Sequence, residues 1–174
     1  MALTTGFGKL ALFKNIPEQH IIESFNVNTI SVLRLIRRFC PTLEAKDDFY
    51  CGVMGSIAGW ISSLFFAVFG ATKATLKIII ESVNVELLKA NTTNQILNVS
   101  PRMIAGTGFY AGKTDFEALH DLSNEIIHHL ENKEDVFIPK YNEVYKFVLQ
   151  RYHDDFRKEG AHSYEHKMNR INQQ

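Results

Sequence analysis

The stretch from Phe49 to Thr72 contains no charged side chain. A transmembrane helix needs about 20 mainly apolar residues, each adding about 1.5 Å. This stretch therefore predicts a single transmembrane helix, with Lys73 and Lys77 where the helix would leave the bilayer. We expect the helix to continue to about Ala90, so that its second half lies outside the membrane and offers a surface to a neighbouring subunit.

Small side chains recur at every fourth position through this stretch. In lipid, helices associate where small residues at this spacing let two backbones approach closely. The pattern predicts a helix–helix interface with another membrane subunit. Its residues are Cys51, Gly55, Gly59, Ser63, Ala67, Ala71 and Thr75.

A cationic amphipathic helix is predicted just before the span, over residues 28–39, with its end at Pro41. Arg34, Arg37 and Arg38 fall on one arc of this helix, and apolar residues cover the opposite side. We expect it to lie in the membrane interface with its arginines on anionic lipid headgroups. The alternative is a helix that faces a protein core while the arginines meet water.

The rest of the chain also predicts helices. Pro17 and Glu18 mark the start of a short one. Thr114 and Glu117 have the spacing of a capping box that opens a helix to about Asn132. A further helix is expected after Pro139, ending near Gly160.

No alternating strand pattern bounded by hairpin signals is evident, so the predicted fold is all-α. It has an N-terminal amphipathic interfacial helix, a single transmembrane helix and C-terminal extramembrane helices. The expected regions are residues 1–48 (interfacial helices), 49–90 (the transmembrane helix with its extension), 91–113 (a connector) and 114–174 (the C-terminal helical region).

Charge and motifs argue against nucleic-acid and nucleotide partners. The chain has 19 basic and 19 acidic residues, whereas a nucleic-acid-binding domain is typically strongly basic. The string GTGFYAGKT, from Gly106 to Thr114, resembles a phosphate-binding loop, but Thr107 stands where that motif requires glycine. We therefore expect neither kind of partner.

Histidines and carboxylates do not form a convincing metal site. Glu117 with His120 and Glu125 with His128 have the Glu-x-x-His spacing of di-iron proteins, but they lie on one predicted helix. The pairs would be about 12 Å apart along the helix axis, whereas two metals in one site are about 4 Å apart. The pair His162 and His166 offers too few ligands. We expect no metal, no cofactor and no catalytic residue.

These features together predict a non-catalytic accessory subunit of a membrane complex, bound to other membrane subunits and to anionic lipid. The plan resembles supernumerary subunits of the respiratory chain or ATP synthase, which places the chain in the mitochondrial inner membrane. Its acid-poor N-terminus and the absence of a signal peptide favour that location. Two alternatives stay open: a small membrane-anchored metal-dependent enzyme that uses the Glu117–His128 helix, and a soluble all-helical interaction protein.

Overall fold

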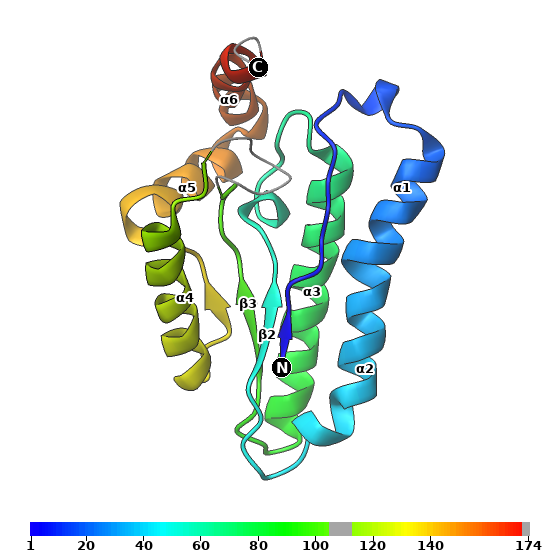
Figure 1. Ribbon diagram of the computed structural model, residues 1–174, viewed down its shortest axis with the longest axis vertical. Coiled ribbons are helices and arrows are strands. Elements are labelled where there is room, and N and C mark those ends of the chain that lie inside the picture. Colours follow the sequence, from blue (N-terminus) through cyan, green and yellow to red (C-terminus); the bar gives the residue numbers. More distant parts are fainter. Residues whose placement is uncertain (105–112, 172–174) are drawn as a thin grey trace.

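A four-stranded parallel sheet lies at the centre of the protein (Figure 1). The computed structural model describes residues 1–104 and 113–171. Strands β1 (Ala2–Leu3), β2 (Cys51–Met54), β3 (Ile96–Val99) and β4 (Val136–Phe137) follow one another across the sheet in chain order. The all-α prediction is therefore wrong, and the fold is α/β.

Three helical segments cover one face of the sheet. Helix α1 (Glu18–Phe25) runs through the π-helical turn η2 (Asn26–Ile30) into α2 (Ser31–Leu43), and α3 (Ala67–Lys89) follows β2. The helix predicted to begin near Pro17 corresponds to α1. The helix predicted over residues 28–39 overlaps η2 and α2. Pro41 lies inside the last turn of α2 and does not end it.

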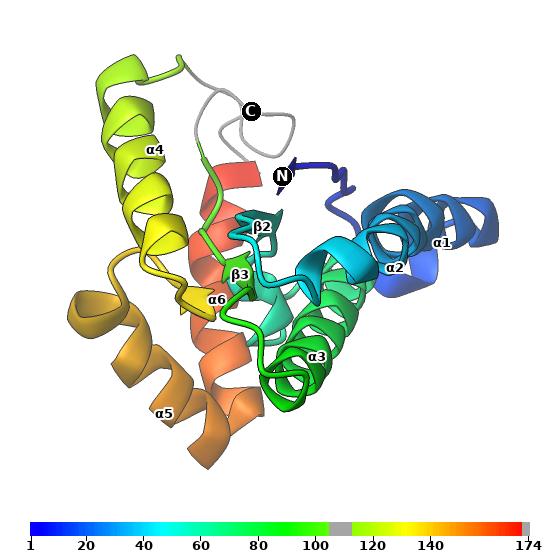
Figure 2. The same ribbon diagram turned by 90° about the horizontal axis from the view of Figure 1, so that it is seen from below.

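Helix α4 (Phe116–Glu131) covers the opposite face, as Figure 2 shows. Its side-chain cap is Asp115, one residue after the predicted Thr114. The chain ends with the π-helical turn η4 (Tyr141–Tyr145), α5 (Lys146–Asp154) and α6 (Phe156–Ile171). Gly160 lies within α6, so the predicted helix end at this glycine is wrong.

The crossover through α4 has the opposite hand to the two before it. All three connections step in the same direction across a parallel sheet. The helices between β1 and β2, and α3 between β2 and β3, lie on one face, whereas α4 lies on the other (Figure 2). Consequently α4 packs on the face of the sheet that α1, α2 and α3 leave open.

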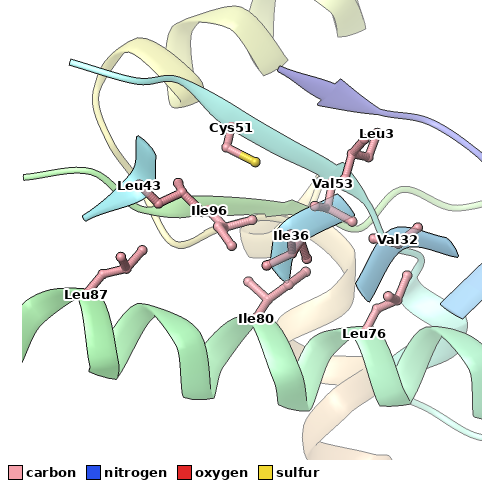
Figure 3. Packing of buried hydrophobic residues seen from close by; sticks show 10 residues of the cluster. All are labelled: Leu3, Val32, Ile36, Leu43, Cys51, Val53, Leu76, Ile80, Leu87 and Ile96. Carbon is pink, nitrogen blue, oxygen red and sulfur yellow. The ribbon is translucent and has the colours of Figure 1, made fainter. Parts of the chain in front are cut away.

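Two apolar clusters hold the helices on the sheet. The larger one, drawn in Figure 3, joins strands β1–β3 to α2 and α3. Its members include Val32, Ile36, Val53, Leu76, Ile80 and Ile96. The smaller cluster joins Leu97, Val99 and Phe137 to the inner side of α4. Alternate residues of β3 thus point to opposite faces, which is why this strand is apolar along most of its length.

The predicted transmembrane helix is not present. Residues 49–90 form β2, the short 3-10 helix η3 (Ile57–Gly59) and α3, so the uncharged stretch is a strand, a loop and the start of a helix. Among the helices of residues 1–104 and 113–171, none combines the length and apolar character that crossing a bilayer requires. The predicted span and the inner-membrane location that depended on it are both wrong.

The seven small residues do not form a ridge on one helix. Cys51 is in β2, Gly59 is in η3, and Ala67, Ala71 and Thr75 are on α3. Gly55 and Ser63 lie in the loops between these elements. The side chains of Ala67 and Ala71 are exposed, whereas Cys51 is buried in the core.

The three arginines of α2 lie on its exposed side. Arg34, Arg37 and Arg38 are solvent-exposed, and Val32 and Ile36 on the other side face the core. This arrangement matches the alternative in which the apolar side packs on protein. Contact of these arginines with anionic headgroups stays a prediction.

Each of the four expected regions contributes one strand to the same sheet. Residues 1–48 supply β1, 49–90 supply β2, 91–113 supply β3 and 114–174 supply β4. The segment 91–113, expected to be a connector, thus contains a buried strand of the core.

Candidate active site

The loops that follow β1, β2 and β3 line one cavity of about 560 Å³. Because the strands are parallel, their carboxyl ends lie at the same edge of the sheet, where α/β proteins commonly bind ligands. The loop segments are residues 4–8, 54–58 and 101–104. Residues from α3, η4, α5 and α6 complete the wall, and Figure 1 shows α5 and α6 at this end of the sheet.

Lys73 is the buried cationic side chain of this cavity. Its residue is only 3% exposed, and its Nζ donates a hydrogen bond of 2.7 Å to the Met54 carbonyl oxygen at the end of β2. The ring centroid of Phe69, one turn earlier on the same face of α3, lies 5.7 Å from Nζ. Burial lowers the pKa of the Lys73 ammonium from its ordinary 10.5 to about 8.

Two glycines hold backbone close to Lys73. A Cβ on Gly59 would lie 2.7 Å from the Lys73 carbonyl carbon, so η3 packs directly on the backbone of α3. A Cβ on Gly6 would lie 3.2 Å from the Lys73 Nζ, so the loop after β1 passes beside the amine. A residue larger than glycine at either position would crowd the lysine or its helix.

Asn28 fixes the loop after β1. Its Oδ1 accepts a hydrogen bond from the Phe7 N–H (2.9 Å), and its Nδ2 donates to the Phe7 carbonyl oxygen (2.8 Å) and to Thr72 Oγ1 (3.2 Å). The side chain is fully buried within the π-helical turn η2, a conformation that often marks functional sites. Asn28 therefore ties the first loop to α3 next to Lys73.

Ser56 joins the second loop to the third. Its Oγ accepts a hydrogen bond from the Ala58 N–H (3.2 Å) and is 3.5 Å from the Pro101 carbonyl oxygen, to which it donates. The same carbonyl accepts from the Ile57 N–H at 3.0 Å. These bonds hold the Ser56 hydroxyl near the carboxyl ends of the strands, among the residues that line the cavity.

Three other titratable residues, Arg102, Tyr145 and Glu159, line the cavity. Glu159 of α6 binds Arg151 through bonds of 2.8 and 3.1 Å, and this interaction lowers the pKa of the Glu159 carboxyl. Burial raises the pKa of Tyr145, and the charge of Arg102 opposes that shift. Lys73 is thus the titratable group of the described lining whose pKa is brought closest to neutrality.

The histidines and carboxylates considered for metal binding lie elsewhere. Glu117, His120, Glu125 and His128 are exposed along α4. Within residues 1–104 and 113–171, no three His, Cys, Asp or Glu side chains gather as a metal site would require. His162 is exposed on α6, and the side chain of His166 lies outside the described residues, as do residues 105–112 of the phosphate-loop-like string.

Comparison with known proteins identifies the fold. Neither a protein-family pattern nor a curated protein sequence matches the chain. Solved structures do match. A short-chain dehydrogenase/reductase from Burkholderia phymatum, in complex with NAD, has a TM-score of 0.70 at 13% identity over 90% of this chain and 65% of that one.

Two alcohol dehydrogenases are similar as well. The enzyme from Thermococcus sibiricus, complexed with 5-hydroxy-NADP, has a TM-score of 0.65 at 14% identity over 79% of this chain and 60% of that one. The bulky-bulky ketone specific enzyme from Comamonas testosteroni has a TM-score of 0.67 at 21% identity, over 93% and 62%. The chain spans less than two thirds of the length of each of the three.

The fold is that of the short-chain dehydrogenases. The prediction of a non-catalytic accessory subunit of a respiratory or ATP synthase complex is wrong, because it depended on an all-α fold with a membrane span, whereas the chain has an α/β fold seen in dehydrogenases and no helix of the described residues could cross a bilayer. The expected partners are corrected too. The membrane-subunit interface depended on a span that the described residues do not form, and two of these neighbours are complexes with nicotinamide dinucleotides, which runs against the prediction of no nucleotide partner.

Proposed function

We propose that the chain forms the substrate-binding part of an oxidoreductase that acts on a small, mainly apolar alcohol or ketone. The observation that carries the proposal is the buried Lys73 amine in a cavity at the carboxyl ends of three strands. A volume of about 560 Å³ is in the range of small-molecule sites. The dehydrogenase fold and the alcohol dehydrogenases among its neighbours support the same reaction class.

The cavity wall determines which ligands fit. Beside Lys73 and Ser56 it is formed largely by apolar and aromatic side chains, among them Ile57, Ile61, Phe66, Phe69, Met103 and Val148. Such a wall favours a ligand with an apolar body and one oxygen atom. That oxygen would accept a hydrogen bond from the Lys73 ammonium, because a charged donor in a buried site binds a neutral acceptor strongly.

Lys73 also has the acidity that the proposed chemistry needs. Reduction of a ketone leaves an oxygen that must gain a proton, and oxidation of an alcohol releases one. A group that transfers this proton works best with a pKa near the working pH, and burial brings the pKa of Lys73 to about 8. We assign to Lys73 the role of holding and moving the proton at the substrate oxygen.

A whole nicotinamide dinucleotide does not fit the described residues. Its pyrophosphate is typically held where a glycine-rich turn leads from a strand directly into a helix N-terminus. Gly6, Gly8 and Ala11 have the spacing of such a turn after β1, but α1 begins only at Glu18. The proposal therefore concerns the substrate, and we derive no step through a dinucleotide.

Calorimetric titration with cyclohexanone tests the proposal. At pH 7 the Lys73 ammonium is mainly protonated, and the Lys73→Met variant removes the charged donor while keeping most of the side-chain volume. A hydrogen bond from a charged donor is worth about 1.5–3 kcal/mol, so we expect binding to weaken about 10- to 100-fold.

Lys89→Met is the matched control, because Lys89 is an exposed lysine at the end of the same helix. This variant should bind cyclohexanone as tightly as the unmodified chain. Equal affinities for all three proteins, or no binding by the unmodified chain, would contradict the proposal.

A further inference from the structure

The surroundings of Lys73 differ from those of an ordinary buried lysine. Buried ammonium groups are usually paired with a carboxylate, since an unpaired buried charge is costly. Within the described part of the chain, the ion pairs of lysines join Lys77 to Glu81 and Lys133 to Asp48, and none includes Lys73. Its polar partner is the neutral Met54 carbonyl.

The environment therefore increases the fraction of neutral amine. Burial lowers the pKa of Lys73, and among the described residues no negative charge counteracts this effect. At pH 7.5 a group with a pKa of about 8 has roughly a quarter of its population as free amine. An ordinary lysine at this pH has about one part in a thousand, roughly 200-fold less.

The amine also borders the cavity. One of its N–H groups is directed to Met54, and the loop beside Nζ contains Gly6, which presents no side chain. The cavity next to it would hold a compact aromatic or aliphatic molecule. A desolvated lysine in an apolar pocket is a known type of nucleophile toward carbonyl carbon.

We propose that Lys73 is a covalent capture site for small apolar aldehydes, which it binds as an imine. The neutral Nζ forms a bond to the aldehyde carbonyl carbon, the resulting carbinolamine loses water, and a C=N double bond remains. The proton that Lys73 gives up to become neutral passes to solvent. The reaction is reversible by hydrolysis and requires no oxidant or reductant.

This inference rests on the proposed function only in that both use the same cavity. The test is reductive trapping: the full chain is incubated at pH 7.5 with limiting benzaldehyde and cyanoborohydride, which delivers hydride to the imine carbon and leaves a stable secondary amine. Peptide mass spectrometry then gives the benzylated fraction at each lysine. We expect Lys73 to be labelled at least tenfold faster than Lys89, although Lys73 is buried and Lys89 is exposed.

Labelling that follows solvent exposure, with Lys89 at or above Lys73, would overturn the inference. The comparison is made within the unmodified chain, so it does not depend on a variant that folds. As a second measurement, Lys73→Arg keeps a cation but cannot form an imine, and should lose the fast-labelling fraction. Persistence of that fraction would likewise overturn it.

Cyclohexanol separates the two proposals. If it occupies the cavity, it should slow labelling of Lys73 and leave Lys89 unaffected. If Lys73 is labelled fast but cyclohexanol does not slow the labelling, imine formation is supported and alcohol binding in the cavity is contradicted. If calorimetry shows that cyclohexanone binds but Lys73 is not labelled fast, ketone binding is supported and imine formation is contradicted.

Discussion

Lys73 is a buried lysine in the wall of the cavity, and its burial has a consequence for stability. Its pKa is lower in the folded chain, about 8, than the ordinary 10.5 that the unfolded chain would have. Between these two values the unfolded chain binds more protons, so the free energy of unfolding rises with pH. The cost of burying the charge is present below pH 8 and is relieved above it.

We therefore expect the free energy of unfolding to rise by about 1 kcal/mol between pH 7 and pH 9. Above pH 9 the rise should be offset, because burial raises the pKa of the Cys51 thiol from 9.0 to about 11 and the unfolded chain then loses that proton first. Urea unfolding at a series of pH values measures the trend. Lys73→Met should abolish the rise and Lys89→Met should keep it; a steady fall in the unmodified chain between pH 7 and pH 9 would refute this account.

The position of Lys73 in the cavity could not be predicted from its sequence neighbours alone. In the sequence Lys73 directly follows an uncharged stretch, and a lysine in that position is also what the end of a membrane span would have. Its site depends on Met54, 19 positions earlier, and on Gly6, which lies beyond two further helices. Only the pairing of β1 with β2 brings these segments together.

At the scale of elements, the segment from β2 through η3 into α3 is where the sequence prediction failed. Strand, 3-10 turn and helix were interpreted as one helix, because apolar content alone does not distinguish a buried strand from a buried helix. Gly52, Gly55 and Gly59 were the available signal, since glycine is unfavourable inside a helix and typical of turns. By contrast, the start of α1, the amphipathic α2 and the capped α4 were predicted nearly correctly, because each has a local pattern of its own.

The close contact of η3 with α3 gives a prediction for this element. Gly59→Ala would place a Cβ 2.7–2.9 Å from backbone atoms of Lys73 and Ala74, which cannot move aside as a flexible side chain would. We expect a loss of about 1–3 kcal/mol in the free energy of unfolding. Chemical denaturation followed by circular dichroism measures it.

Gly160→Ala is the matched control. A Cβ at Gly160 would meet nothing within 4 Å, and the residue lies inside α6, so this change should leave stability unchanged or raise it by up to about 1 kcal/mol. Equal effects of the two substitutions would show that the packing of η3 on α3 is not as described.

For the whole molecule, the parallel sheet is the feature that could not be predicted from the sequence. Two of its strands have two residues each and the other two have four, too few for an alternating pattern to be recognised. β3 is buried on both faces, so it has no polar side to alternate with. The cavity lies where these short strands, distant in the chain, end at one edge, and it could not be located without that arrangement.

The central claim is that a small ketone or alcohol binds at this edge, against Lys73. The most direct measurement is a two-dimensional ¹H–¹⁵N NMR titration of the chain with cyclohexanone, with the backbone amides assigned. We predict that the shifted amides belong to residues 4–8, to Gly55, Ser56, Ile57 and Ala58, and to the turn of α3 around Lys73, and that the amides of α4 stay in place. Shifts confined to other surfaces, or no shifts at concentrations that saturate a millimolar site, would contradict the account.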